Sequence, residues 1–189
     1  MALARIGRLD EAIAHDEEAL RLKPDSSGGR KPEDEVLRFN ASEAHYNLGN
    51  IFLSQRRVPE ALEQFQEALQ ARPADAASHN GMGIALSRTG QPAEAIGHFE
   101  QALEINPDYT EAQVNLAVTL AGEGRLPEAI AHFEAALRLQ PGLPAVHFDM
   151  GNALFQAGRR SDAIGQYREA LRLKPDFTQA QAALERLEK

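Results

Sequence analysis

Prolines recur along most of this chain at a fixed step of 34 residues, at positions 73, 107, 141 and 175. The same step relates three further ladders, one of aromatic residues and two of alanine. Their members are Phe65, Phe99, Phe133 and Tyr167; Ala61, Ala95, Ala129 and Ala163; and Ala68, Ala102, Ala136 and Ala170. Self-similarity at a period of about 20–50 residues is the signature of repeat architectures, in which each unit stacks on its neighbours. The ladders therefore predict an array of similar units.

Each unit carries the pattern of two amphipathic helices. In the first unit, apolar residues recur at helical spacing in two successive stripes, which indicates one buried face per helix. The stripes are Ala44, Leu48, Ile51 and Phe52, followed by Ala61, Leu62, Phe65 and Leu69. Glycines at 90, 124 and 158 stand where the first helix must end in a left-handed residue. Arg56 occupies that position in the first unit, where we expect a strain of about 1 kcal/mol.

A representative unit reads His79-x2-Met82-Gly83-x2-Leu86, then Ala95-x3-Phe99, and ends at Pro107. This pattern resembles the tetratricopeptide repeat (TPR), a helix–turn–helix unit of about 34 residues. The resemblance covers four whole repeats, which span 42–75, 76–109, 110–143 and 144–177. It implies an all-α fold, a right-handed α-solenoid, similar to bacterial TPR arrays. The fourth position departs from the family's large aromatic residue and holds His, His, Gln and His.

Both ends of the array are irregular. Residues 1–24 match only a half repeat, so we expect that the segment belongs to a longer array. Residues 25–41 are an insertion, which we interpret as a flexible loop followed by an N-terminal extension of a long helix over about 33–55. Residues 178–189 predict a C-terminal capping helix with Ala182, Leu184 and Leu187 on its packed face.

The half repeat leaves an apolar helix face with little cover, which consists of Ala12, Ile13, Leu20 and Leu22. An uncovered face of this kind promotes association. Two outcomes are open: the extension with Val36, Leu37 and Phe39 folds over the gap, or two chains form a homodimer through their N-terminal edges.

Composition excludes several partners. The net charge of −8 without a basic block disfavours nucleic acid, and no apolar run is long enough for direct membrane insertion. The chain has no cysteine, which is compatible with a cytoplasmic protein.

The sequence gives no sign of an enzyme, a cofactor or a metal site, because no catalytic or phosphate-binding motif is present. The six histidines recur at two repeat positions, the fourth (His45, His79 and His147) and the twenty-third (His15, His98 and His132). Equivalent positions of stacked helices are about 8–10 Å apart, too far to share one ion. We therefore interpret the histidines as packing residues.

The TPR resemblance places positions 2, 5, 6, 9, 12 and 13 of each unit on a concave surface, and this defines a candidate peptide-binding groove. Its residues mix apolar side chains with amides, as a binding surface does. They are Tyr46, Asn47, Asn50, Asn80, Ile84, Arg88, Val114, Asn115, Val118, Phe148, Asp149, Asn152 and Phe155.

Asn47 and Asn115 at the sixth position resemble the asparagine ladder in the TPR superhelix of the O-linked N-acetylglucosamine transferases, which bonds a peptide backbone. Gly81 and Asp149 interrupt the ladder here. Arg88 is the one cation expected in the groove, so an acidic peptide tail is disfavoured.

These observations favour a protein–protein interaction scaffold that binds an extended or helical segment of a partner protein. One alternative is that the segment is the substrate-recruiting TPR arm of a larger enzyme, such as a glycosyltransferase, or of a membrane-anchored assembly factor. A second alternative is a self-assembling scaffold.

Overall fold

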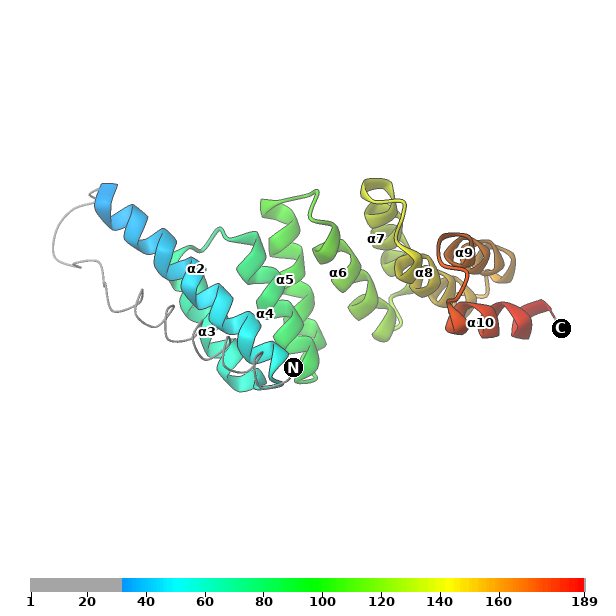
Figure 1. Cartoon of the computed structure of the whole chain (residues 1–189), viewed down its shortest axis with the longest axis horizontal. Coiled ribbons are helices and arrows are strands. Elements are labelled where there is room, and N and C mark those ends of the chain that lie inside the picture. Colours follow the sequence, from blue (N-terminus) through cyan, green and yellow to red (C-terminus); the bar gives the residue numbers. More distant parts are fainter. Residues whose placement is uncertain (1–31, 189) are drawn as a thin grey trace. The chain divides into compact units, whose positions relative to one another are not determined.

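The structure is a computed structural model, which describes the backbone of residues 32–188 and the side chains of residue 36 and residues 38–188. The described part of the chain consists of helices joined by short turns, without a strand (Figure 1). The helices are α2 (Pro32–Ser54), α3 (Val58–Ala71), α4 (Ala76–Arg88), α5 (Pro92–Ile105), α6 (Thr110–Gly122), α7 (Leu126–Leu139), α8 (Pro144–Gln156), α9 (Arg160–Leu173) and α10 (Thr178–Glu188).

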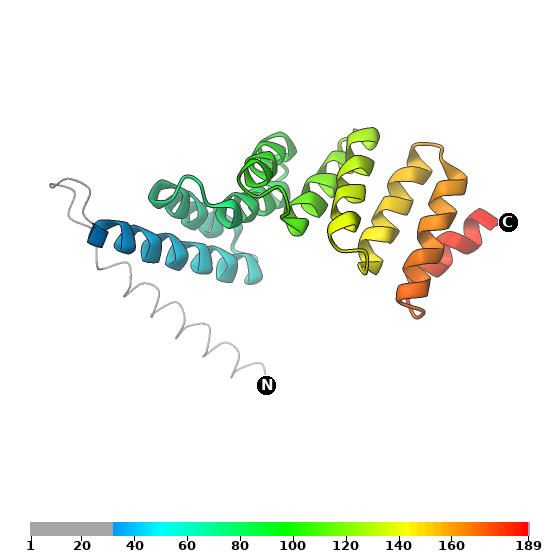
Figure 2. The ribbon, with the colours of Figure 1, turned by 90° about the horizontal axis from the view of Figure 1, so that it is seen from above.

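The chain forms two compact units, of which the first ends at Ile105 and the second begins at Asn106. In the first unit α2 packs on α3 and α4 packs on α5, and the two pairs meet through α3 and α4. In the second unit α6 packs on α7 and α8 packs on α9, and α10 covers α9. Figure 2 shows the antiparallel helices of these pairs side by side. Within each unit the predicted all-α, helix–turn–helix architecture is confirmed.

The aromatic ladder forms the core. Phe65 and Tyr167 are fully buried, and Phe99 and Phe133 are 1% exposed. Glycine on the first helix lets the ring approach closely, because a Cβ atom on Gly83 would lie 2.6 Å from Cε1 of Phe99. The burial predicted for Phe65 in the apolar stripe of its helix is confirmed.

The turns inside the helix pairs use a left-handed residue, as predicted. Gly90, Gly124 and Gly158 have φ between +74 and +78°. Arg56 adopts φ +62° at the equivalent place, the one non-glycine residue with positive φ in the described chain. The same hydrogen bond closes both kinds of turn: the N–H of Arg57 donates to the Phe52 carbonyl at 2.9 Å, as that of Arg125 does to Leu120. Arg56 therefore holds a conformation that costs about 1 kcal/mol relative to glycine.

The capping helix α10 is present, but its packed face differs from the prediction. Ala180, Ala183 and Leu187 are buried, whereas Ala182 is exposed and Leu184 is half-buried. The buried residues follow a spacing of three and four, which keeps one stripe of the helix against α9. The prediction for Ala182 was wrong because, at about 100° per residue, Ala182 lies about 140° around the helix from the buried Leu187, so the two side chains cannot share one stripe.

The helix extension predicted for residues 33–41 belongs to α2, which begins at Pro32. Val36 and Phe39 on it are exposed, and the guanidinium of Arg72 lies 4.5 Å from the Phe39 ring centroid. The half repeat 1–24, the turn at 25–31, His15 and the Leu37 side chain lie outside the described residues, so the N-terminal edge stays a prediction. No described helix has both the length and the apolar character needed to cross a membrane.

Candidate peptide-binding faces

Each unit presents its own first helices as a candidate face, and the two faces are described separately. The first-unit face lies on α2 and α4, which are neighbours, and the second-unit face lies on α6 and α8, which are also neighbours. The first-unit face consists of Tyr46, Asn47, Asn50, Asn80, Ile84 and Arg88. The second-unit face consists of Val114, Asn115, Val118, Phe148, Asp149, Asn152 and Phe155.

The apolar side chains of the first-unit face are partly used by the core. Tyr46 and Ile84 are half-buried and pack against the cluster around Phe65. The ring centroids of Tyr46 and Phe65 are 6.1 Å apart. Asn47 and Asn50 are exposed, whereas Asn80 is only 7% exposed and already has an interaction partner. This face therefore offers mainly amide groups to a ligand.

The second-unit face is more apolar. Val118 is 47% exposed and Phe155 is 39% exposed. Val114 and Phe148 are half-buried. The guanidinium of Arg186, from α10, lies 5.7 Å from the centroid of the Phe155 ring. Phe155 is thus supported on one side by the cap and open on the other.

A hydrogen bond between the helices of one pair fixes an amide on this face. The Tyr167 hydroxyl donates to Oδ1 of Asn152 at 2.9 Å. Phe148 packs against both Tyr167 and Phe177, with centroid distances of 5.8 and 5.1 Å. Because Oδ1 is occupied by Tyr167, the Nδ2 group of Asn152 is the part left to donate to a ligand.

Sequence reasoning missed the roles of Tyr167 and Phe177 in this cluster. Tyr167 was placed in the core ladder, and its hydroxyl is what distinguishes it from Phe65, Phe99 and Phe133. That one difference within the ladder was the available signal.

Asp149 is half-buried on α8 and forms no ion pair with a described residue. Burial raises the pKa of its carboxyl group above the ordinary value. The charged form is therefore held at a cost that a cationic ligand group would offset.

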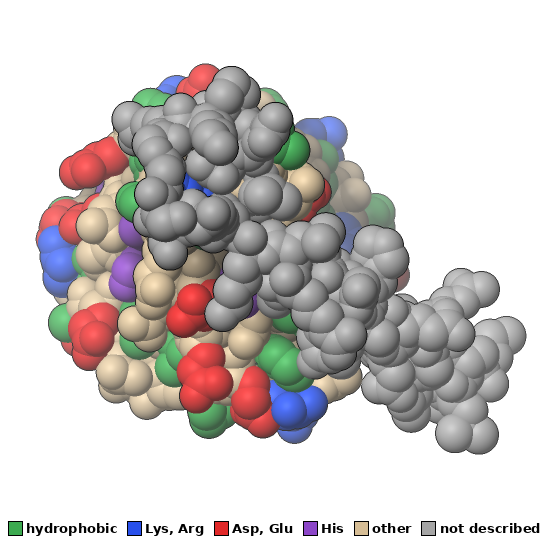
Figure 3. Space-filling view, turned by 90° about the vertical axis from the view of Figure 1, so that its left-hand side faces the viewer, with side chains coloured by type: hydrophobic (Ala, Val, Ile, Leu, Met, Phe, Trp, Pro, Cys, Tyr) green, Lys and Arg blue, Asp and Glu red, His purple; other side chains and the backbone are tan. Residues whose placement is uncertain are grey.

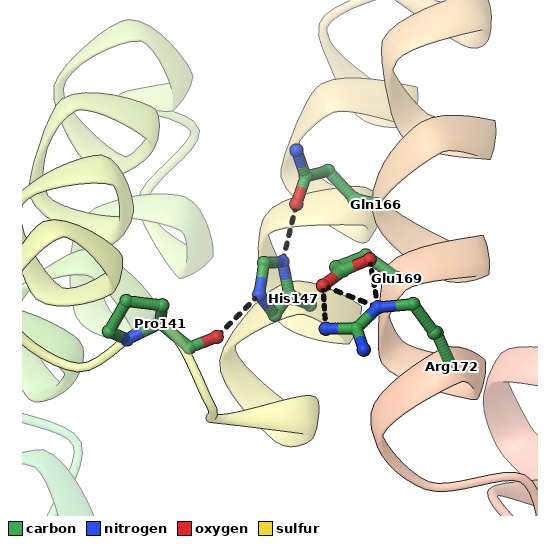
Figure 4. Close-up of polar contacts among 5 residues, drawn as sticks. All are labelled: Pro141, His147, Gln166, Glu169 and Arg172. Atoms are coloured by element: carbon green, nitrogen blue, oxygen red, sulfur yellow. Dashed lines mark hydrogen bonds and ion pairs between the residues drawn. The ribbon is translucent and has the colours of Figure 1, made fainter.

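The described histidines pair within repeats. His45, His132 and His147 each lie 2.7–2.8 Å from a glutamine amide oxygen 19 residues away in the same repeat. Figure 4 shows His147 between Gln166 on α9 and the carbonyl of Pro141 in the preceding loop, with Nε2 donating to that carbonyl at 3.1 Å. The His147 side chain thus links α9, the second helix of its repeat, to the loop that precedes α8, and this is a structural role.

The described residues contain no group of three or more potential metal ligands. The second repeat is the exception to the imidazole–amide pairing, because His79 and His98 face each other there.

Glu60 and Glu128, in the first turns of α3 and α7, are ion-paired with arginines. Glu60 bonds Arg57 at 2.9 Å, and Glu128 bonds Arg125 at 2.6 Å. Hydrogen bonds from these arginines lower the pKa of both carboxyl groups. Arg57 and Arg125 are the N-cap residues of α3 and α7, and neither forms a side-chain cap hydrogen bond. On the end of the molecule drawn in Figure 3, acidic and basic side chains are interspersed.

The chain is a helical repeat protein. It has paired antiparallel helices, buried rings of the aromatic ladder at the twenty-fourth position of each repeat, and left-handed turns at a 34-residue step. Three family models, each described as a tetratricopeptide repeat, match residues 40–108, 80–144 and 120–187. The chain belongs to the tetratricopeptide repeat family. No curated protein sequence matches it.

Solved structures share this fold. YrrB, described as a TPR protein with an unusual peptide-binding site, has 27% sequence identity and a TM-score of 0.72, and the match covers 97% of this chain and 87% of YrrB. MamA has 19% identity and a TM-score of 0.74, with coverage of 93% and 94%. MamA 41-end from Desulfovibrio magneticus RS-1 has 20% identity and a TM-score of 0.73, with coverage of 77% and 82%. The MamA similarities show the fold alone.

Proposed function

We propose that this chain is a non-catalytic scaffold that binds an extended or helical segment of a partner protein, with the second-unit face as the main contact surface. The observation that carries the proposal is the combination of exposed Val118 and Phe155 on neighbouring helices with an Asn152 amide held in place by Tyr167. Clustered exposed apolar residues near oriented polar groups are typical of a peptide-binding surface.

The face indicates the chemistry of the segment. Apolar side chains of the partner would cover Val118 and Phe155, and a backbone carbonyl would accept from Nδ2 of Asn152. A lysine or arginine near Asp149 would offset the cost of its half-buried charge. Because the surface is shallow, we expect a micromolar affinity, about −8 kcal/mol.

Similarity to YrrB supports peptide binding as the class of function. YrrB is described as having a peptide-binding site, and its fold matches nearly the whole of this chain at 27% identity. The residues of the second-unit face, and not the similarity to YrrB, indicate what kind of segment this chain binds.

A selected peptide tests the proposal. Random 12-residue peptides are selected on the full chain, and the strongest binder is mapped by amide hydrogen exchange. We expect slower exchange in α6 and α8, because a bound segment shields that surface. Protection confined to the second helices α7 and α9 would contradict the assignment of the face.

The proposal extends to location and assembly. A cysteine-free chain suits the reducing cytoplasm, so we propose a cytoplasmic scaffold. We also propose that two chains form a homodimer through their N-terminal edges. Light scattering over a dilution series tests it, and a constant monomer mass would contradict it.

A further inference from the structure

A pocket of about 480 Å3 opens in the first unit where α2 turns into α3. Its lining combines two arginines with apolar side chains and one hydroxyl. The lining residues are Leu53, Ser54, Arg56, Val58 and Arg88. Arg56 comes from the turn and Arg88 from the last residue of α4, so the two positive charges reach the pocket from different elements.

Neither guanidinium is neutralised by an acidic group of the described chain. Arg88 donates from Nη1 to the Leu53 carbonyl at 2.9 Å, which uses one of its five N–H groups. The guanidinium of Arg56 forms no ion pair or hydrogen bond with a described residue, and only its backbone N–H is bonded, to the Leu53 carbonyl at 3.2 Å. The adjacent Arg57, in contrast, is paired with Glu60 at 2.9 Å. Two guanidinium groups without an acidic partner among the described residues therefore share one pocket in a protein of net charge −8.

The backbone of Arg56 gives a second, independent observation. Its φ of +62° is the conformation that glycine adopts at Gly90, Gly124 and Gly158. The turn forms with glycine through the same hydrogen bond, so the turn itself does not explain an arginine here. Bulky residues in this region of φ are strained, and such strain clusters at ligand contacts. An arginine therefore stands at a position whose backbone conformation disfavours any residue with a long side chain.

We propose that this pocket binds the carboxylate of an acidic side chain in the partner segment, with an adjacent apolar residue against Leu53 and Val58. This inference rests on the proposed function, because it assigns an anchor to the segment that the scaffold binds. Guanidinium groups bind carboxylates through charge-assisted hydrogen bonds. The pocket includes Leu53, Ser54 and Arg88, which belong to positions 12 and 13 of the concave surface. It therefore lies along the edge of the first-unit face, where a passing chain presents a side chain rather than its end.

The pocket changes one sequence-based argument. The sequence disfavours an acidic peptide tail because Arg88 is the one cation expected in the groove. The structure adds Arg56 from the turn to the same pocket, and this second charge favours an acidic residue at that point.

Three small probes distinguish the possible carboxylates in an NMR titration of the full chain. Acetyl-Leu-Glu-amide carries a side-chain carboxylate, acetyl-Leu-Gln-amide is its neutral match, and acetyl-Leu-Gln with a free C-terminus carries a terminal carboxylate. We expect the glutamate probe to shift the backbone amides of residues 53–58 and 88 with a Kd of about 1 mM. The neutral probe should bind at least about tenfold more weakly. Equal binding of the charged and neutral probes overturns the proposal, and stronger binding of the free terminus overturns the assignment to a side chain.

Charge-matched variants complete the test. Arg88→Gln and Arg56→Gly should each weaken the glutamate probe by about fivefold. Arg57→Gln removes the same charge outside the pocket and should leave the Kd unchanged. Arg56→Gly should also raise the thermal midpoint by about 2–4 °C, because glycine adopts the turn without strain. A loss of binding together with a gain in stability cannot come from misfolding.

An equal loss of binding in Arg57→Gln would show that only long-range charge acts, and this would overturn the pocket. The probes are too small to report on the α6 and α8 face. Their failure therefore leaves the proposed function standing, whereas failure of the selected peptide on α6 and α8 would leave the carboxylate result intact.

Discussion

Nδ1 of His79 lies 3.0 Å from Nδ1 of His98, and the two rings join α4 to α5 in the second repeat. Nε2 of His79 donates to the Pro73 carbonyl at 3.0 Å, since a carbonyl oxygen only accepts. The Nδ1 atom of the neutral His79 ring then accepts from Nδ1–H of His98. Protonation of both rings would place two N–H groups against each other and break this bond.

The histidine pair predicts a stability that falls in mild acid. Burial, and then the charge of His79, lower the pKa of His98, while Glu94 opposes the shift. A depressed folded pKa means that the unfolded chain binds the proton more strongly. The contribution of neutral His98 to the free energy of unfolding is therefore complete above about pH 6.5, and it is lost as the pH falls through the lower folded pKa. Because His98 is half-exposed, the loss stays under about 1 kcal/mol.

The variant His98→Gln tests this account, because glutamine stands at the same position in the first and fourth whole repeats, as Gln64 and Gln166. Urea unfolding at pH 7.5 and pH 5.0 gives the free energy of unfolding of both proteins. We expect the wild type to lose more stability between the two pH values than the variant does. An identical loss in both would contradict the proton-sharing pair.

Phe99→Ala should lower the free energy of unfolding by about 3–5 kcal/mol, because the ring is 1% exposed and fills the space left by Gly83. Ile105→Ala on the same helix is the control, since that side chain is 41% exposed and should change stability by less than about 0.5 kcal/mol. Denaturant unfolding measures both. A cost below about 1 kcal/mol for Phe99→Ala would mean that the ring is not a core residue.

The bond between Tyr167 and Asn152 should give a measurable coupling energy. A double-mutant cycle with Tyr167→Phe and Asn152→Ala is expected to yield about 0.5–1.5 kcal/mol in unfolding experiments. Tyr167→Phe is a mild change, because phenylalanine stands at this position in the other three whole repeats. Additive effects of the two substitutions would show that the hydroxyl does not hold the amide.

Asp149→Asn should stabilise the free protein at neutral pH by less than about 1 kcal/mol. Burial raises the pKa of this carboxyl group, so its folded pKa exceeds its unfolded value. Protonation therefore favours the folded state, and the charged form weakens it as the pH rises through the folded pKa. The stability difference between variant and wild type should shrink from pH 7 to pH 3 in thermal melts. A stability difference that grows as the pH falls would contradict burial of the charged Asp149 carboxyl group as its cause.

The helix pairs and their buried faces could be predicted from the sequence, because the 34-residue period and the residue type agree at each ladder position. Phe65 and Tyr167 are buried where the ladder required, and Arg56 has the left-handed backbone that its place in the repeat predicted. A pattern of this kind reports which residues face the core and which end a helix. It does not report the rotation of a helix outside the repeat, and so Ala182 on α10 was assigned to the wrong face.

The site was less accessible to sequence reasoning, because it depends on contacts between side chains. The fourth and twenty-third positions were recognised as repeat positions, yet their pairing, as in His147 with Gln166, emerged only from the structure. The regular separation of 19 residues and the matching of imidazole with amide were signals already present in the chain. The pocket of Arg56 and Arg88 had no such signal, because it joins a turn to the end of a helix 32 residues away.

The most direct test of the central claim is the affinity of the selected 12-residue peptide, measured by calorimetry on matched variants of the second unit. Val118→Ser with Phe155→Ser removes the two exposed apolar side chains of the proposed face. Leu139→Ser is the control, because Leu139 is 38% exposed at the end of α7, outside that face. The account predicts at least a tenfold weaker Kd for the double variant, with circular dichroism unchanged, and an unaltered Kd for the control. Wild-type affinity in the folded double variant, or a loss in Leu139→Ser alone, would contradict it.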